Sequence, residues 1–261
     1  MAQAQARLAR SKLACIPTRA VHLVIDAANP AKLAAFWAAV LGWEVAADEE
    51  DEVVAVEPAG FDYPSPAAMP LVFVPVQDAK TVKNRVHLDL SSVSPEDQSA
   101  QIERALALGA ERTDIGQGDV PWEVLADPEG NEFCILEPRD TYMDARPVAA
   151  IVLDCAHPDA LAEFWSLATG WDVHKKLPVF AALRAPGGTG PFLELLGVPD
   201  AKTAKNRLHV DVAPLAGGDT EAEARRLEAA GAVRADIRQG DVSWVVLADP
   251  EGSEFCVLSP R

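Results

Sequence analysis

The sequence is short of cysteines, long apolar runs and basic residues, and each shortage excludes a class of protein. Of its four cysteines, Cys134 and Cys256 lie inside apolar segments, where a disulfide would require two domain interiors to meet. Free, buried thiols in a reducing cytoplasm fit this pattern better. No apolar run approaches the roughly 18 residues that a membrane-spanning helix needs, so we expect no membrane partner.

Basic residues are outnumbered, because 23 Lys and Arg stand against 40 Asp and Glu, for a formal net charge of −17. Such a surface repels a phosphate backbone, so nucleic acid is not an expected partner. The chain also lacks a glycine-rich phosphate-binding loop and a nucleophilic serine motif. Residues 1–19 lack the apolar stretch of a secretion signal, and we interpret them as a leader of a cytoplasmic protein.

What the sequence does contain is a long internal repeat. The segment KNRVHLDL at 83–90 returns as KNRLHVDV at 205–212, at an offset of 122 residues. The segment GDVPWEVLADPEGNEFCILE at 118–137 returns at the same offset as GDVSWVVLADPEGSEFCVLS. An earlier part of the two copies corresponds at an offset of 128, so the second copy has lost a short loop segment. The chain is therefore a tandem duplication.

Each copy of the repeat predicts two β-α-β-β-β modules. In the first module, residues 21–26 form an apolar run typical of a strand. Asn29 and Pro30 then predict a helix start, apolar residues follow at helical spacing, and Gly42 predicts the helix end. We divide the chain into a leader, domain 1, a linker and domain 2, at residues 1–19, 20–137, 138–149 and 150–261.

The paired βαβββ modules, the helix that ends in FW…LGW, the HLDL strand and the closing DPEGNEFCIL resemble the vicinal oxygen chelate superfamily. This superfamily contains glyoxalase I, extradiol dioxygenases and the bleomycin- and fosfomycin-resistance proteins, and the likeness is greatest to its bacterial glyoxalase-like members. It implies an α+β fold in which four modules pair into two domains, each with a curved, eight-stranded sheet around a concave site. It also implies an intramolecular pseudo-dimer, or a homodimer, but no particular activity.

In metal-dependent members of the superfamily, four ligands come from the first, fourth, fifth and eighth strands of a module pair. The resemblance places His22, Val74, His87 and Cys134 at these positions in domain 1, and Ala150, Leu196, His209 and Cys256 in domain 2. Because several of these side chains cannot bind a metal, we expect no cofactor. A divalent metal in domain 1, if bound, would be held by His22, His87 and Cys134, a set that suits zinc.

His87 and Asp89 are two residues apart on one predicted strand, so both face the same side, and His209 and Asp211 repeat the arrangement. A carboxylate that orients an imidazole makes a general base, so His87 and Asp89 are candidate catalytic residues. A hydrogen-bonded structural pair explains the same pattern, and both interpretations stay open.

The remaining candidates are ligand-binding residues on the concave faces. Trp122 and Trp244 provide flat apolar walls or core packing. His22, Cys134, His209 and Asp211 are further ligand-binding candidates. Cys134 and Cys256 are either nucleophiles or inert core thiols, and no adjacent signature supports a nucleophile. We expect His22 to lie opposite His87, which would make domain 1 the better site.

The resulting prediction is a protein that binds or converts a small organic molecule without a complete four-ligand metal site. The alternative is a metal-dependent lyase, isomerase or dioxygenase that uses His22 and His87. A third possibility is that domain 2 is a degenerate half that only completes the structure.

Overall fold

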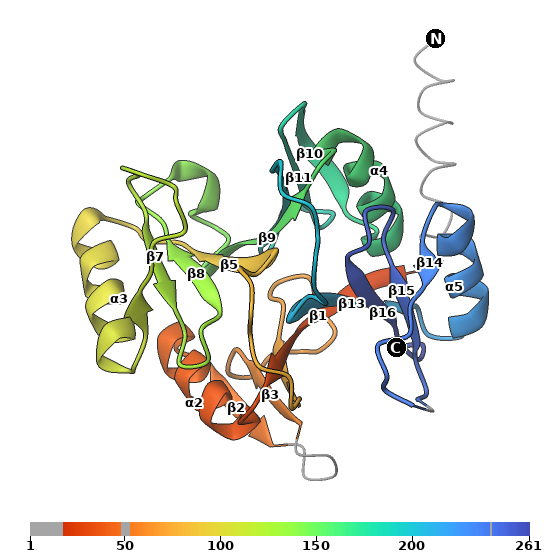
Figure 1. The fold of residues 1–261 in the computed structure, drawn as a ribbon, viewed down its shortest axis with the longest axis horizontal. Helices are drawn as coiled ribbons and strands as arrows, with labels where there is room; N and C mark the ends of the chain where they lie inside the picture. Colours follow the sequence, from red (N-terminus) through yellow and green to blue (C-terminus); the bar gives the residue numbers. More distant parts are fainter. Residues whose placement is uncertain (1–17, 48–52, 241) are drawn as a thin grey trace.

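The computed structural model describes residues 18–47, 53–240 and 242–261. Four modules follow one another along the chain, each a strand, a helix and three strands (Figure 1). Module 1 contains β1 (Thr18–Ala27), α2 (Pro30–Leu41), β2 (Glu44–Ala47), β3 (Val54–Glu57) and β4 (Leu71–Pro75). Module 2 contains β5 (Val86–Leu90), α3 (Pro95–Ala107), β6 (Glu111–Arg112), β7 (Glu123–Ala126) and β8 (Glu132–Ile135).

The second half repeats this order after a connecting segment that includes the short 3-10 helix η1 (Asp140–Tyr142). Module 3 contains β9 (Val148–Cys155), α4 (Pro158–Thr169), β10 (Asp172–Leu177), β11 (Phe180–Arg184) and β12 (Phe192–Gly197). Module 4 contains β13 (Leu208–Pro214), α5 (Thr220–Ala229), β14 (Val233–Arg234), β15 (Val245–Ala248) and β16 (Glu254–Val257). None of the described helices is both long and apolar enough to cross a membrane.

Helix α2 begins and ends as its sequence predicts. The Asn29 side chain accepts a hydrogen bond from the backbone N–H of Lys32, which satisfies one of the free donors of the first turn. Pro30 occupies the first turn, where its missing N–H costs nothing. Gly42 ends the helix at a φ of 68°, a left-handed conformation that glycine adopts without strain.

The two eight-stranded sheets confirm the predicted α+β fold, but the modules pair across the two halves. Sheet A has the order β14-β15-β16-β13-β1-β4-β3-β2, so module 1 pairs with module 4. Sheet B has the order β10-β11-β12-β9-β5-β8-β7-β6, so module 2 pairs with module 3. Our expectation that each sequence half closes its own sheet, with His22 opposite His87, is therefore wrong.

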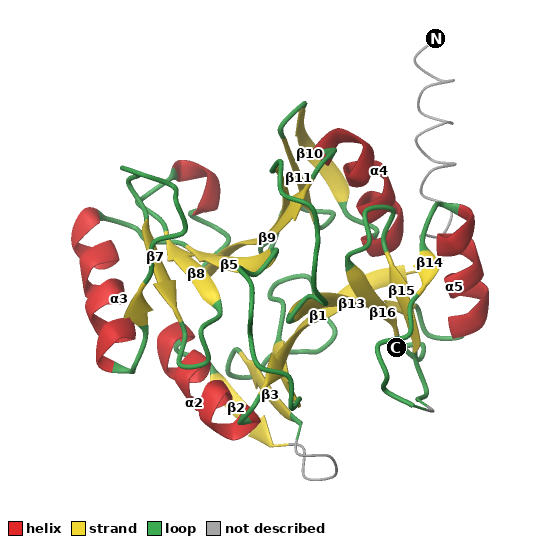
Figure 2. Cartoon of the chain, viewed as in Figure 1, coloured by secondary structure: helices red, strands yellow, loops and turns green. Residues whose placement is uncertain are grey.

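The hydrophobic core links the modules in the other direction, within each half. Trp37 of α2 packs edge-on against Phe133 of β8 with ring centroids 5.0 Å apart, and its indole N–H donates to Asp127 at 3.2 Å. Trp165 of α4 makes the same contact with Phe255 of β16, at 5.4 Å. Helices α2 and α4 thus contact strands of both sheets, and one core cluster runs through all four modules (Figure 2).

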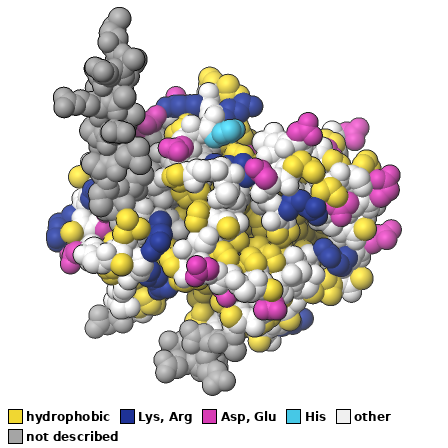
Figure 3. All heavy atoms as spheres, turned by 180° about the vertical axis from the view of Figure 1, so that it is seen from behind, with side chains coloured by type: hydrophobic (Ala, Val, Ile, Leu, Met, Phe, Trp, Pro, Cys, Tyr) yellow, Lys and Arg dark blue, Asp and Glu magenta, His cyan; other side chains and the backbone are white. Residues whose placement is uncertain are grey.

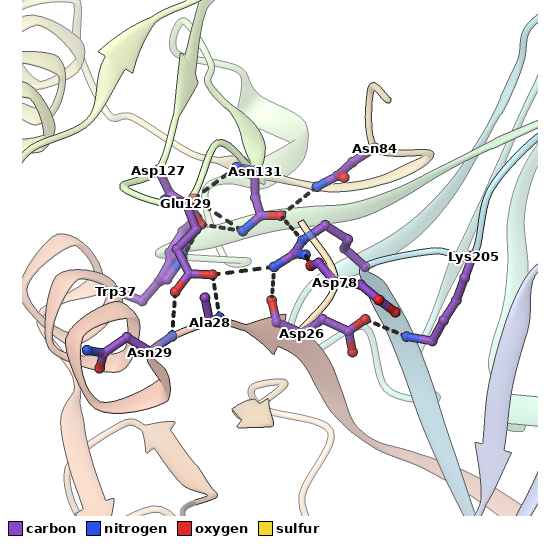
Figure 4. A network of polar contacts seen from close by, with 11 residues as sticks. Asp26, Ala28, Asn29, Trp37, Asp78, Asn84, Asp127, Glu129, Asn131 and Lys205 are labelled. Atoms are coloured by element: carbon purple, nitrogen blue, oxygen red, sulfur yellow. Dashed lines mark hydrogen bonds and ion pairs between the residues drawn. The ribbon is translucent and has the colours of Figure 1, made fainter. Parts of the chain in front are cut away.

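Arg207, at the start of module 4, joins the two halves through partners that all belong to the first half (Figure 4). Its guanidinium donates to the backbone oxygens of Asp26 at 2.6 Å and Asp78 at 2.8 Å. It also reaches the carboxylate of Glu129 and the side-chain oxygen of Asn131, each at 3.3 Å. Several charge-assisted hydrogen bonds from one side chain make this a strong connection between the copies.

The repeat-equivalent Arg85 donates to the backbone oxygens of Asp154 and Asp200, each at 2.7 Å, but its network is incomplete. Asn131 is replaced by Ser253 in the second copy. As a result, the Nε atom of Arg85 and the Nδ2 atom of Asn206 are buried without a partner among the described residues. The loops 78–85 and 200–207, which carry these side chains, line a cavity of about 600 Å³ where the two halves meet.

The surface shows no concentration of the chain's acidic residues on the face turned away in Figure 1. Acidic and basic side chains are interspersed there, and hydrophobic side chains gather towards its middle (Figure 3).

Replacing Ser253 by Asn should complete the Arg85 network and stabilise the protein. The new amide would offer an acceptor to Arg85 and Asn206, and each restored hydrogen bond is worth about 1 kcal/mol. We expect the thermal unfolding midpoint to rise by about 2–4 °C per kcal/mol for a chain of this size. The reciprocal variant Asn131→Ser should lower it, and a decrease in Ser253→Asn would show that the asymmetry has another cause.

Candidate functional site

The concave face of sheet A brings together His22, Asp211, His209 and Cys256. His22 and Asp211 lie opposite each other in the antiparallel pairing of β1 with β13. The Nε2 atom of His22 donates to Oδ2 of Asp211 at 2.8 Å. The Nε2 atom of His209 lies 3.3 Å from Oδ1 of Asp211 and 3.5 Å from Sγ of Cys256. The site therefore takes one residue from the first half and three from the second.

Asp211 is the charged centre of this group. Burial by itself raises the pKa of a carboxyl, but the hydrogen bonds and charges of His209 and His22 outweigh it here. They hold the pKa of Asp211 well below its usual range, so this carboxyl group is ionised at neutral pH. By contrast, burial and the nearby Asp211 carboxylate raise the pKa of the Cys256 thiol, which keeps it protonated.

Tyr63 closes the site from the loop between β3 and β4. Its hydroxyl lies 3.5 Å from Nδ1 of His22, and the two rings stack with centroids 6.4 Å apart. In the neutral form of His22 that donates from Nε2 to Asp211, Nδ1 presents its lone pair towards the phenol. Sequence reasoning missed Tyr63, because a tyrosine in a loop rich in glycine and proline carries no periodic signal.

The concave face of sheet B carries the equivalent trio His87, Asp89 and Cys134, but a different fourth residue. Asp89 lies opposite Ala150 of β9, where sheet A has His22 opposite Asp211. His87 approaches Asp89 at 3.5 Å, and Oδ1 of Asp89, like Oδ1 of Asp211, has no hydrogen-bond partner among the described residues. The carboxylate thus lacks the second imidazole that stabilises its counterpart.

As a consequence, the protonation states of His87 and Asp89 differ from those on sheet A. Burial, assisted by the negative charge of Glu194, raises the pKa of Asp89 to about 7. Burial also lowers the pKa of His87 to about 4, so this imidazole is neutral at physiological pH. Burial likewise raises the pKa of the Cys134 thiol. Sheet B therefore holds a neutral imidazole and a carboxyl group that is about half protonated at pH 7, where sheet A holds an ionised carboxylate.

The segment between the two halves covers the concave face of sheet B. The hydroxyl of Tyr142 donates to Glu194 of β12 at 2.8 Å, and its ring packs edge-on against Phe192. Tyr142 and Ala145 are buried in a cluster with the concave-face residue Cys134. The stretch that we predicted as a linker is thus packed against the sheet, and β9 already begins at Val148.

The two tryptophans lie at the rims of the two concave faces. Trp122 and Trp244 are half-buried against the concave-face clusters, and each indole N–H donates to a glutamine, Gln117 at 2.7 Å and Gln239 at 3.0 Å. Glu194 of β12, two residues before the predicted fourth-strand position Leu196, lies opposite Val152 on β9.

The metal-ligand set expected for domain 1 does not form. His22 belongs to sheet A, whereas His87 and Cys134 belong to sheet B, so these three residues do not share a site. The reason is the cross-half pairing of the modules, which exchanges the partners of the two first strands. The donor groups that cluster within 4.8 Å of one another are His87, Asp89 and Cys134 on one sheet, and His209, Asp211 and Cys256 on the other.

Comparison with known proteins agrees with this architecture. The family model described as Glyoxalase-like domain matches residues 22–136 and 150–258, so the chain belongs to this family. Its two copies and cross-paired sheets make it a tandem member of the vicinal oxygen chelate superfamily.

Two solved structures illustrate the likeness of fold. Glyoxalase I from Zea mays shares 14% identity at a TM-score of 0.66, with 93% of this chain and 92% of that chain covered. A putative dioxygenase from Bacillus subtilis shares 15% identity at a TM-score of 0.60, with 93% of this chain and 85% of that chain covered. Comparison with curated proteins found no significant match.

The raised pKa of Asp89 predicts a specific pH dependence of stability. The unfolded chain releases this proton near pH 4 and the folded chain near pH 7, so Asp89 favours folding below that window and loses its contribution as the pH rises through it. Relative to wild type, Asp89→Asn should gain stability from pH 4 to pH 8, by about 2 °C or more in the unfolding midpoint. Thermal unfolding at steps of one pH unit measures this difference.

Asp211→Asn is the matched control, because its pKa is shifted in the opposite direction. The stabilising contribution of Asp211 is present above pH 4 and is lost as the pH falls towards its lowered pKa. The control should therefore be less stable than wild type at pH 7, and the deficit should shrink in acid. A gap between Asp89→Asn and wild type that stays constant over pH 4–8 would contradict the assignment.

Proposed function

We propose that the protein binds a small organic molecule at the concave face of sheet A and moves a proton on it with the His22–Asp211 pair. The observation that supports this most directly is the 2.8 Å hydrogen bond between Nε2 of His22 and the ionised carboxylate of Asp211. A carboxylate that fixes the tautomer of an imidazole leaves the opposite ring nitrogen as a proton acceptor. In this arrangement that nitrogen is Nδ1 of His22.

The surrounding residues supply what a proton transfer requires. The phenol of Tyr63 is a neutral donor at Nδ1 of His22, since burial raises its pKa despite the opposing charges of Arg261 and Arg19. The Nε2 atom of His209 lies 3.3 Å from the other oxygen of Asp211 and helps to lower the pKa of this carboxyl group. Val21 and Leu258 provide apolar wall beside these polar groups, which is the usual composition of a small-molecule site.

Sheet B is the weaker candidate, although we expected catalysis from His87 and Asp89. With a pKa of about 7, Asp89 is protonated in about half of the molecules at neutral pH and is a poorer partner for an imidazole. Tyr142 already donates a hydrogen bond to Glu194, and its segment covers the concave face of sheet B. The proposal therefore assigns the proton acceptor to the sheet that contains His22.

A divalent metal at the same place is the second candidate, favoured by the cross-half pairing. Three of the four positions that the superfamily uses for metal ligands carry donors in sheet A, namely His22, His209 and Cys256, with Asp211 between them. Imidazole, carboxylate and thiolate donors in this number fit zinc. Such an ion would supply Lewis-acid chemistry, and the small organic molecule would bind beside it on the same concave face.

Variants of the two sheets test the proposal. We expect compounds found by a thermal-shift screen to exchange a C–H proton with D₂O in the presence of the protein, measured by ¹H NMR. Asp211→Asn and His22→Gln should slow this exchange by about 100-fold or more, the usual contribution of a positioned base. Asp89→Asn, the equivalent change on sheet B, should leave the rate within about two-fold.

Metal content of the same preparations separates the two candidates. Exchange that persists after chelation, in protein with clearly less than one divalent ion per chain, supports the metal-free reading. Stoichiometric zinc that is lost in both His22→Gln and His209→Gln would instead support a metal-dependent site. Exchange that is lost in Asp89→Asn and kept in Asp211→Asn would place the site on the other sheet.

A further inference from the structure

The cavity between the two halves has two buried donors on one side that differ from their counterparts on the other side. In the first copy, the side-chain oxygen of Asn131 accepts from Nδ2 of Asn84 at 3.0 Å and from Nε of Arg207 at 3.3 Å (Figure 4). In the second copy the equivalent donors are Nδ2 of Asn206 and Nε of Arg85. Neither has a hydrogen-bond partner among the described residues. Buried donors of this kind are rare, so the pair calls for an acceptor.

The frame around these donors is the same in both copies. The backbone N–H of Asn206 donates to Glu254 at 3.1 Å, and its counterpart in the first copy donates to Glu132 at 3.1 Å. The two arginines also donate to equivalent backbone oxygens. Only the acceptor differs, because Ser253 replaces Asn131. The two donors of the second copy therefore converge on the position that the Asn131 oxygen holds in the first.

The charge of Arg85 favours an anionic acceptor at this position. Arg207 lies 3.3 Å from the carboxylate of Glu129, whereas none of the ion pairs among the described residues includes Arg85. A guanidinium group binds a carboxylate more strongly than it binds a neutral oxygen.

Both donor residues line the cavity of about 600 Å³ where the halves meet, and Asp154 lines it with them. Asp154 is 4% exposed, and one of its oxygens pairs with Lys83 at 2.5 Å. Its other oxygen, Oδ1, has no partner among the described residues. The cavity thus has an acceptor beside the two donors. Small residues supply much of the remaining wall, namely Ala79, Thr81, Val82, Ala201, Thr203 and Ala204.

We propose that this cavity binds a small carboxylic acid that carries a hydroxyl or ammonium group next to its carboxylate. The carboxylate accepts from Arg85 and Asn206, and the neighbouring hydroxyl or ammonium group donates to Asp154. Asp78 and Asp200 also line the cavity, and their negative charges disfavour a second carboxylate on the ligand. The site is separate from the concave faces and independent of the proton transfer proposed above. Because Arg85 and Asn206 belong to different halves, the ligand joins the two copies.

Four probes of similar shape test this proposal with the full-length protein. Mandelate carries the hydroxyl group, phenylglycine carries the ammonium group, phenylacetate carries neither, and mandelamide lacks the charge. We expect isothermal titration calorimetry to show one mandelate or phenylglycine bound per chain, and the tighter of the two identifies the preferred donor. Phenylacetate should bind about three-fold more weakly or worse, and mandelamide about ten-fold more weakly or worse, as expected for a lost neutral and a lost charge-assisted hydrogen bond.

Variants of the two copies locate the site. Arg85→Gln should weaken the binding of mandelate by about ten-fold or more. Ser253→Asn should weaken it similarly, because the new amide oxygen takes the position of the carboxylate. Since Ser253→Asn is also expected to raise the unfolding midpoint, its loss of binding would not reflect unfolding. Asn131→Ser is the matched control, and it should keep the affinity because Arg207 retains Glu129.

Other outcomes would overturn the proposal. These are no binding of mandelate or phenylglycine, equal binding of mandelamide, or affinity unchanged in both Arg85→Gln and Ser253→Asn. Binding that is lost in Asp211→Asn and kept in Arg85→Gln would place the compound on the concave face of sheet A. Failure of the proton exchange described above, with mandelate binding intact, would leave the cavity site standing.

Discussion

The antiparallel pairing of β1 with β13, and of β5 with β9, is the interaction on which the rest of the structure depends. These central strands join module 1 to module 4 and module 2 to module 3, so every concave face draws on both halves of the chain. The hydrophobic core follows the other direction and packs the modules of each half together. Strand pairing therefore holds the two halves together, and separating them would expose the edges of the four central strands.

The same pairing decides the chemistry of the two faces. A histidine on β1 opposite Asp211 keeps that carboxylate ionised, whereas an alanine on β9 opposite Asp89 leaves the equivalent carboxyl with a pKa near 7. The residue on the first strand, His22 or Ala150, therefore sets the charge of the aspartate opposite it, Asp211 or Asp89. In both sheets this aspartate lies more than 60 residues away in the sequence. Electrostatic state here is a property of the strand pair and cannot be assigned to the His-x-Asp motif alone.

Much of the fold could be predicted from the sequence, because local signals determine the modules. The Asn29 cap, the Gly42 stop and the alternation of His87 with Asp89 each act over a few residues, and all are visible in a single sequence. The duplication also gives the number of modules. Module pairing could not be predicted in this way, since both copies carry nearly identical strands and the same edges are compatible with either partner.

The candidate site was only partly accessible for the same reason. The HxD pairs and the cysteines sit in periodic strands, so sequence alone could identify them as facing residues. Tyr63 comes from a loop of the same module as His22, and the cross-half pairing brings Arg261 of module 4 to it. Tyr142 reaches sheet B from a segment that looked like an unstructured connection, where a buried aromatic residue gives no pattern to detect.

The segment that carries Tyr142 has a wider consequence for a duplicated chain. In an assembly of two identical copies, any side chain that covers one concave face must cover the other, so both faces are kept or lost together. A connection between fused copies exists only once and breaks that symmetry. Because the connecting segment covers one concave face, the residues beneath it are no longer under selection for ligand binding. The other face can then diverge without a mirror image, so fusion allows one specialised cup to evolve from two equivalent ones.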